Sequence, residues 1–330
     1  MTECPDFDYL LVMPRLRVQS ANAISSPLTH GFPAMSAFIG LMWALQRKTV
    51  STGMDIRFQA VSVVVHDHEE QVTDDAFVRF FRLTRNPIKR DGKTSAIVEE
   101  GRIHLDISLI FAVTGTSLRN QQEAARFAQQ VKDLLGNMRI AGGTVVSSKA
   151  PVQRQHPYVV PQTGDSEGRK KLFNRLKMQL LPGFLLVERQ DLLEQRYRQL
   201  QEVNPDVTRL DAWLSLSRIN WRWQSANENV EKDGWHHDRA GLGWVVPIPV
   251  GYGALTEMQQ AGTVANARDN TTPFRFVESL FGIGQWLSPH RLENPQQMLW
   301  FAKSDVETGL YRCCNRYKSQ HTNEFEFDFS

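Results

Sequence analysis

The chain has 330 residues, of which 41% are hydrophobic and 22% are charged, with a formal net charge of +2. This is an ordinary globular balance, with enough apolar mass for one large domain or two smaller ones. No apolar stretch reaches the roughly 18–20 residues that span a bilayer, and residues 1–8 are acidic, so we expect neither a membrane span nor a secretory signal. Cys4, Cys313 and Cys314 have neither a zinc-ligand spacing nor that of a disulfide framework, which predicts a reducing, cytoplasmic location.

Arginine outnumbers lysine by 27 to 11. The planar guanidinium group pairs with phosphate through two hydrogen bonds and stacks on bases. A GC-rich genome also encodes arginine readily, so the charge permits nucleic-acid binding without requiring it.

The first half of the chain predicts a β-α-β-β-α-β order of elements. Residues 9–18 form an apolar run of strand length, and the loop 22–33 ends at Pro33, which can open a helix at its first turn. Apolar residues at helical spacing continue through residue 45. Strands at 56–65 and 103–113, a helix at 124–135 and a strand at 138–146 complete the order. It is the order of a ferredoxin-like α+β domain, which RNA-recognition domains also use, and we assign this core to residues 1–150.

A long insertion, residues 67–101, separates the second and third predicted strands. It is rich in arginine and lysine set among aromatic and small residues. A projecting arm of this composition suits docking on RNA or on a neighbouring subunit, whereas the simpler interpretation is a solvated surface loop.

The second half, residues 151–330, is predicted to be helical and irregular. Its elements are a polar connector at 150–165, a basic helix at 166–180, a short buried strand at 184–187, helices at 189–203 and 208–216, a polar and mobile stretch at 225–238, an edge strand or extended segment at 244–250, a helix at 272–287 and a disordered tail at 321–330. The segment 244–250 contains Pro247 and Pro249, which cannot donate a hydrogen bond within a sheet.

A search for catalytic chemistry finds no strong constellation. The glycine pairs around Tyr252 and Ile283 lack the third glycine and the strand-to-helix setting of a phosphate loop. His66 and His68 have only acidic neighbours to complete a zinc site, so we expect no metal. His30 is the one candidate for a metal-independent ribonuclease, and we favour a role for it in binding RNA over general acid–base catalysis.

Binding features remain. Short polar side chains between Asn22 and Phe32 suit phosphate contact, and Phe32 either stacks on a base or packs the next helix against the core. Gly142 and Gly143 either let RNA approach the backbone or form a bulge in a strand. The arginines near residues 268 and 291 either face a nucleic acid or take part in buried networks.

Six segments carry a more specific signal: ANAISSPLTHGFP (21–33), FRLTRNPIKRDGKTSAIVEEGR (81–102), MRIAGGT (138–144), LLPGFLLVER (180–189), GWVVPIPVGYGAL (243–255) and NARDNTTPFRFVESLFGIGQWLSPHR (266–291). Together they resemble the family of the second Csy protein, the Cas-five-like subunit of the type I-F CRISPR surveillance complex. The resemblance extends from about residue 9 to residue 312, and it excludes residues 150–165, 221–238 and those after 317.

This resemblance implies a non-catalytic subunit with a ferredoxin-like core and an arm between its second and third strands. It implies that the protein holds the 5′ handle of the CRISPR RNA, pairs with the large subunit at the tail of the complex and reaches an adjacent backbone subunit through the arm. Target DNA is then contacted indirectly, through guide pairing, and no cofactor or membrane is involved. The rival hypotheses are a precursor-RNA endonuclease and a protein scaffold that makes no RNA contact.

The predicted RNA-binding residues are short polar side chains, glycines, one aromatic residue and basic residues. They are Asn22, Ser25, Ser26, His30, Gly31, Phe32, Arg85, Arg90, Arg102, Arg139, Gly142, Gly143, Arg268, Arg275, His290 and Arg291.

Overall fold

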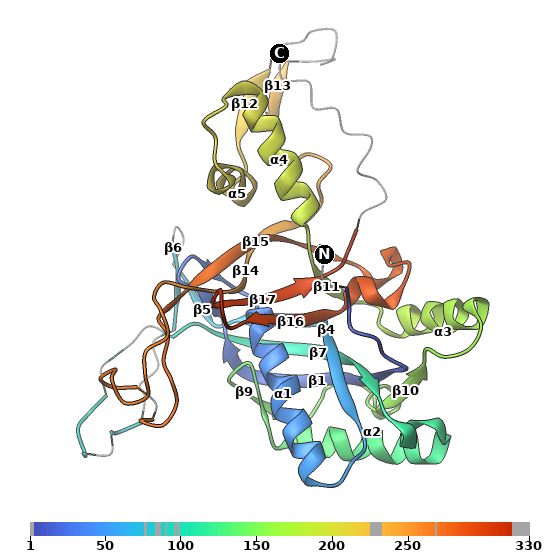
Figure 1. Ribbon diagram of the computed structural model, residues 1–330. Coiled ribbons are helices and arrows are strands. Elements are labelled where there is room, and N and C mark those ends of the chain that lie inside the picture. The colour runs from blue at the N-terminus through green and yellow to red at the C-terminus, as the bar shows by residue number, and fades with distance from the viewer. Residues whose placement is uncertain are drawn as a thin grey trace.

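The computed structural model describes residues 3–75, 78–82, 87–89, 91–95, 97, 100–224, 233–267 and 269–318. Five α-helices and one large antiparallel sheet lie within these ranges (Figure 1). The predicted mixture of helices and strands is therefore confirmed. The helices are α1 (Met35–Ser51), α2 (Gln121–Gly136), α3 (Ser166–Gln179), α4 (Gln190–Val203) and α5 (Arg209–Ser217).

The strands of the first half form one part of the sheet. β4 (Arg57–Glu70), β7 (Arg102–Thr114), β1 (Tyr9–Asn22) and β9 (Gly143–Val146) are neighbours in that order, and each pairing is antiparallel. α1 lies between β1 and β4 in the chain, and α2 lies between β7 and β8 (Arg139–Ile140). The elements predicted between residues 9 and 146 are all present, except that 138–146 is a hairpin of β8 and β9 and not a single strand.

β1 is apolar along most of its length because both faces of the sheet are covered there. Leu11 and Met13 face a first core that includes residues of α1 and α2. Leu10 and Val12 face a second core that includes residues of α3. All four side chains are fully buried, and each contributes about 1.5–3 kcal/mol relative to an exposed position.

The second half extends the same sheet, so its predicted helical and irregular character is wrong where residues 251–254, 277–287, 300–305 and 310–315 form strands. β4 pairs with both β16 and β11, and the pairings among β4, β11, β15, β14, β17 and β16 close into a ring. Strands from both sides of residue 150 share this sheet. The domain boundary near that residue stays a prediction. The second-half strands in the ring are β11 (Phe184–Glu188), β14 (Val245–Ala254), β15 (Val277–Leu287), β16 (Trp300–Asp305) and β17 (Leu310–Asn315).

The helix predicted at 272–287 is wrong, since most of this segment is β15. Gly282 and Gly284 each disfavour a helix by about 1 kcal/mol relative to alanine. In the sheet, glycine is required by close packing: a Cβ atom on Gly284 would lie 2.9 Å from Leu186 Cδ1 and 3.0 Å from Ile248 Cδ1.

Pro247 and Pro249 lie in the part of β14 that pairs with β15 alone, whereas β17 pairs only with Gly251–Gly253. The segment 244–250 is thus an edge on one side, as its prolines predict. The basic helix, the strand at 184–187 and the helices at 189–203 and 208–216 are also confirmed as α3, β11, α4 and α5.

Several shorter strands complete the structure. In the inserted arm, β5 (Val72–Asp75) pairs with β6 (Val78–Phe81). The connector predicted at 150–165 contains β10 (Tyr158–Pro161), which pairs with the start of β1. Residues 225–232 and 321–330 lie outside the described residues.

α4 and α5 pack against β14 and β15 around a third, smaller core. Trp213 Nε1 donates a hydrogen bond to the carbonyl oxygen of Gly282 at 2.9 Å. A hairpin of β12 (Trp221–Gln224) and β13 (Gly234–His237) stands beyond these helices, away from the large sheet, at the top of Figure 1. Residues 234–237, predicted to be mobile, are therefore strand. None of the described helices is long and apolar enough to cross a membrane.

Candidate nucleic-acid interface

The chain between β1 and α1 forms a small hairpin of β2 (Ile24–Ser26) and β3 (Thr29–His30). The hydroxyl groups of Ser25 and Ser26 hydrogen-bond to Thr29 Oγ1 at 2.8 and 2.7 Å. Asn22 Nδ2 donates to the Ile24 carbonyl oxygen at 2.7 Å. Three of the predicted polar residues therefore hold the hairpin in shape.

A groove of about 710 Å³ lies beside this hairpin, and we call it the hairpin groove. One wall is a small-residue face of α1 that includes Gly40, a second is the β8–β9 turn, and a third is formed by two tyrosines of β14 and β17. Four predicted residues, from two segments that are far apart in the sequence, line it together: Asn22, Ser25, Arg139 and Gly142.

Arg139 is the basic residue of the hairpin groove. It is exposed, and its Nη1 donates to the Gly142 carbonyl oxygen at 3.2 Å. No acidic side chain in the described ranges forms an ion pair with it. Gly142 has a φ of +81° and nothing within 4 Å of a Cβ position. The turn therefore offers a guanidinium group that has no ion-pair partner among the described residues, beside a backbone that a ligand can approach closely.

Tyr252 and Tyr311 are functional candidates that the sequence did not reveal. Their ring centroids are 6.3 Å apart, and Tyr252 is 40% exposed. Burial raises the pKa of Tyr311 to about 12, so its hydroxyl stays protonated at neutral pH. The sequence showed Tyr252 only as the centre of a glycine pair that failed as a phosphate loop, and only the pairing of β14 with β17 brings the two rings together.

His30 lies at the mouth of the hairpin, where its side chain is 68% exposed. Its Nδ1 is 2.9 Å from Glu70 Oε1, and its ring contacts Phe81 edge to face with centroids 5.6 Å apart. Gly31 follows with a φ of +104°, and its N–H donates to the Ala23 carbonyl oxygen at 2.8 Å. The histidine therefore joins the hairpin to the base of the arm.

Phe32 and Gly143 have packing roles in the structure. The Phe32 ring stacks on Phe38 at 5.3 Å and meets Trp286 edge to face at 5.1 Å. A Cβ atom on Gly143 would lie 2.7 Å from the Ala21 nitrogen, so glycine lets β9 pack against β1. For Phe32 the geometry matches the packing alternative that the sequence leaves open, whereas Gly143 lies in regular strand pairing and not in a bulge.

The remaining basic residues do not line the hairpin groove. Arg102 forms an ion pair with Glu100, and Arg275 Nη1 donates to the Val306 carbonyl oxygen at 2.9 Å. His290 and Arg291 lie in a short helical turn that packs against α3. The predictions for Arg85, Arg90 and Arg268 lie outside the described residues. RNA contact by any of the sixteen residues stays a prediction.

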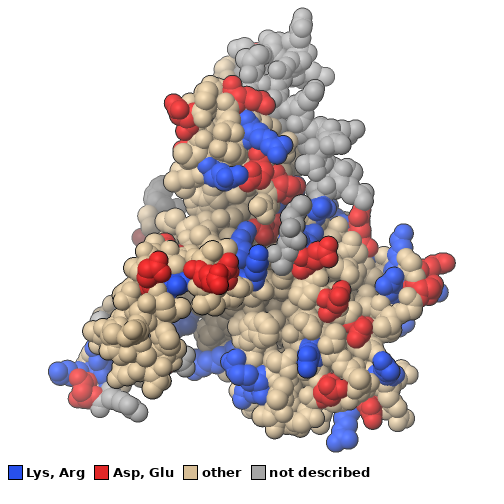
Figure 2. Space-filling view, in the orientation of Figure 1, with Lys and Arg blue, Asp and Glu red and all other residues tan. Residues whose placement is uncertain are grey.

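Figure 2 shows Lys and Arg side chains interspersed with Asp and Glu over the visible face. Such a surface has no broad field of one sign, consistent with the net charge of +2. A polyanion bound on this face would therefore depend on a few well-placed cations.

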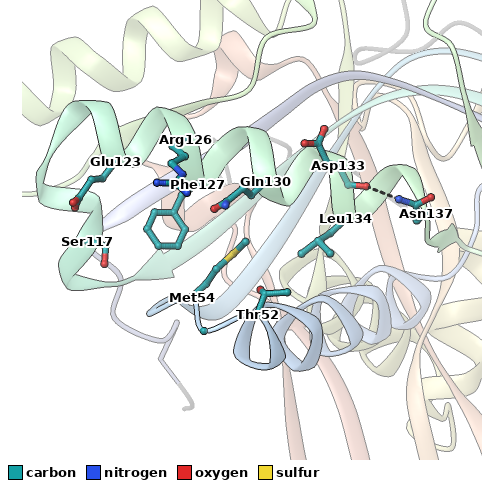
Figure 3. Close-up of a pocket in the computed structure, with 11 residues that line it drawn as sticks. Thr52, Met54, Ser117, Glu123, Arg126, Phe127, Gln130, Asp133, Leu134 and Asn137 are labelled. Carbon is teal, nitrogen blue, oxygen red and sulfur yellow. Dashed lines mark hydrogen bonds between the residues drawn. The ribbon is translucent and has the colours of Figure 1, made fainter.

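A second depression, of about 520 Å³, lies between the C-terminal end of α1 and α2 (Figure 3). Met54, Phe127 and Leu134 line it together with Arg126 and Asp133. None of the residues predicted from the sequence lines it, so Arg126 serves below as a control position.

Metal and thiol chemistry find little support in the described residues. Those ranges contain no group of three or more His, Cys, Asp or Glu that could hold a metal ion. His66 Nδ1 contacts the Pro182 carbonyl oxygen and Nε2 contacts Ser108 Oγ, both at 2.7 Å. Burial raises the pKa of the Cys313 thiol to about 12, which makes it a poor nucleophile.

The pKa of His66 predicts a measurable pH dependence of stability. Burial lowers it from 6.5 to about 4, so the unfolded chain binds this proton first as the pH falls. The stability linked to this pKa difference is fully present above pH 6.5. It is lost as the pH falls from 6.5 to 4, and it amounts to about 3 kcal/mol. Urea denaturation between pH 7 and 4.5 should show a weaker loss of stability for His66→Gln than for the wild type. His290→Gln, at an exposed site, should follow the wild type, and equal slopes for all three proteins would contradict the assignment.

Comparison with known proteins identifies the family. Residues 11–313 match the family model described as CRISPR-associated protein (Cas_Csy2). The chain is also 45% identical over 315 residues to the CRISPR-associated protein Csy2 of Pseudomonas aeruginosa (strain UCBPP-PA14), covering 93% of this chain and 95% of that protein. The chain belongs to the Csy2 family.

Membership of the Csy2 family makes this a CRISPR-associated protein, and the matched residues cover both halves of the sheet. The match begins within β1 and ends within β17, so it includes every wall of the hairpin groove. The groove therefore lies within the residues that match the family model.

Proposed function

We propose that this chain is a non-catalytic subunit of a type I-F CRISPR surveillance complex, in which it binds the 5′ handle of the CRISPR RNA at the hairpin groove. The observation that carries the proposal is the presence of Asn22, Ser25, Arg139 and Gly142 in one groove of a Csy2-family protein. Short polar side chains, arginine and glycine are residue types that suit phosphate contact.

The groove suggests how a single strand would be held. Arg139 would pair with a phosphate, and the open backbone at Gly142 would let the strand approach closely. The exposed face of Tyr252 would stack on a base, which is worth about 1–3 kcal/mol per base. None of these contacts requires a covalent step.

We further propose that residues 9–146 form a ferredoxin-like core. The antiparallel order β4-β7-β1-β9, with α1 and α2 in the two crossovers, supports this. In the complex, the protein would pair with the large subunit at the tail, contact an adjacent backbone subunit through the arm and act on target DNA indirectly, all in the cytoplasm.

The rival function is a metal-independent endoribonuclease. One contact favours it: His30 Nδ1 is 2.9 Å from Glu70 Oε1, and such a pair can act as a general acid and base. Incubation of the purified protein with repeat-containing RNA in the presence of a chelator tests it. Cleavage that is abolished by His30→Ala would overturn the non-catalytic proposal.

The direct test is co-expression with the other genes of the operon, followed by identification of the co-purifying RNA. In the double variant Arg139→Glu/Tyr252→Ala, we expect RNA retention at 0.2 M salt to fall about 10- to 100-fold, because a cation and a stacking surface are both lost.

Arg126→Glu is the matched control, since Arg126 is exposed and lies outside the hairpin groove. It should retain RNA, and the thermal unfolding of both variants should match the wild type. If the double variant retains RNA as the wild type does, the groove is not the RNA site. If the assembly contains no RNA at all, the scaffold hypothesis replaces this one.

A further inference from the structure

α3 carries a basic surface that the proposed RNA site does not use. Arg169, Lys170, Lys171 and Arg175 are exposed along this helix, and Lys177 is half-buried near its end. Lys177 Nζ donates to the Leu292 carbonyl oxygen at 2.7 Å, next to Arg291. We call this set the α3 surface, and it consists of Arg169, Lys170, Lys171, Arg175, Lys177, His290 and Arg291.

The α3 surface and the hairpin groove lie on opposite faces of the sheet. The buried residues of α3, Phe173 and Leu176, belong to the second core with Leu10 and Val12. The residues of α1 beside the groove pack on the first core. Figure 1 shows α3 at the right-hand edge of the molecule, away from α1. A strand held in the groove would therefore not neutralise these cations.

The charges of the α3 surface are largely uncompensated. Within the described ranges, no acidic side chain forms an ion pair with Arg169, Lys170, Lys171 or Arg175. Burial and then the charge of Lys170 lower the pKa of Lys177, so these two lysines repel one another, and the charge of Glu293 only partly opposes this. A polyanion would relieve this repulsion.

The surface is also hollowed. A groove of about 820 Å³ is lined by Arg169, Lys170 and Lys177 along α3, with Asn174 and Gln162 as neutral donors. Asp6 and Glu293 also line this groove, and the charge of Glu293 raises the pKa of Lys177, so phosphate contacts would fall mainly to Arg169 and Lys170. Amide and guanidinium donors side by side are typical of contacts to a nucleic-acid backbone.

The groove offers little aromatic surface for stacking. Phe7, one of the two aromatic residues that line it, is half-buried and packs on the second core. Phe173 is only 1% exposed, and Lys177 Nζ covers its ring at 5.3 Å from the centroid. Single strands are held by bases stacked on exposed rings, whereas a duplex keeps its bases stacked internally and offers phosphates. We propose that the α3 surface binds the phosphates of double-stranded DNA without base specificity. The choice of DNA rests on the proposed function, in which the complex acts on a DNA target. The α3 surface would add a direct, sequence-independent contact to the indirect recognition proposed above.

The test uses the assembly obtained by co-expression and a fluorescent 30-base-pair DNA duplex that is unrelated to the guide. The variant is Arg169→Gln/Lys170→Gln/Lys171→Gln, and the control is Arg47→Gln/Lys48→Gln/Arg126→Gln, which removes the same charge from exposed positions on α1 and α2. Only the α3 variant should lose duplex affinity, about 10- to 100-fold near 0.1 M salt. The slope of log K against log salt should fall by about 2–3, one unit per lost phosphate contact.

The outcomes separate this inference from the proposed function. Loss of duplex binding with normal RNA content supports both. Loss of duplex binding in an assembly that contains no RNA supports the α3 surface and overturns the RNA proposal. The α3 proposal would be overturned if duplex binding is unchanged or if the control variant loses as much affinity. It would also be overturned if the α3 variant loses its RNA or a partner subunit and keeps duplex binding. Single-stranded DNA and double-stranded RNA of equal length serve as competitors, and preferential displacement by either would also contradict it.

Discussion

Replacing Arg312 by methionine is expected to lower the free energy of unfolding by about 3–5 kcal/mol, because it leaves a buried carboxylate without its cation. Glu188 is 6% exposed, and Arg312 Nη2 contacts its Oε1. Arg312 Nη1 also donates to the carbonyl oxygens of Val250 at 3.1 Å and Cys313 at 3.0 Å. The guanidinium group thus joins β11, β14 and β17 inside the ring of strands.

Urea denaturation followed by tryptophan fluorescence measures this effect. Burial raises the pKa of Glu188 and Arg312 opposes that rise, so the variant should raise it further. With a folded pKa above the unfolded one, the variant loses stability as the pH rises, and its deficit should shrink toward pH 4. The double variant Glu188→Gln/Arg312→Met should recover part of the loss.

Arg209→Met is the matched control, since Arg209 and Glu194 form an ion pair at the surface. Its denaturation midpoint should stay close to that of the wild type. If Arg312→Met behaves in the same way, the buried pair does not stabilise the ring.

Replacing Gly251 by alanine is expected to destabilise the protein by about 2–6 kcal/mol, through backbone strain and overpacking of about 1–3 kcal/mol each. Gly251 has a φ of +146°, and a Cβ atom there would lie 2.0 Å from the Tyr311 carbonyl oxygen. The clash would separate β14 from β17 where Tyr252 and Tyr311 meet, so RNA retention should fall as well.

Gly164→Ala separates the two causes. Gly164 has a φ of +103° but nothing within 4 Å of its Cβ position, so it adds strain without a clash. Thermal unfolding should rank the wild type first, Gly164→Ala second and Gly251→Ala last. Equal losses in the two variants would show that close packing of β14 on β17 does not matter.

The elements of the first half could be predicted because local pattern and tertiary environment agree there. The alternation of residues 103–113 predicts only a strand, and the amphipathic spacing of residues 124–135 predicts only a helix. The segment 272–287 fails for the opposite reason, since its phenylalanines match a helical spacing while Gly282 and Gly284 are needed for contacts across the sheet.

The residues of the candidate site also divide into those that the sequence indicates and those that only the structure reveals. Asn22, Ser25, Arg139 and Gly142 were identified by residue type, because short polar donors, arginine and glycine suit phosphate contact wherever they occur. Tyr252 and Tyr311 were missed because they lie 59 positions apart by residue number and meet only through strand pairing. The sequence does not distinguish the two roles of Phe32, whereas its contacts with Phe38 and Trp286 in the structure are those of a packing residue.

By itself, the sequence determined the family and most elements of the first half, and it suggested the residue types of a candidate RNA-binding surface, because these depend on local order along the chain. Only the tertiary structure decided that the second half completes the sheet, that the hairpin groove has three walls and that His290 and Arg291 belong with α3. The reason is that strand pairing and burial join residues across long separations, which no local pattern specifies.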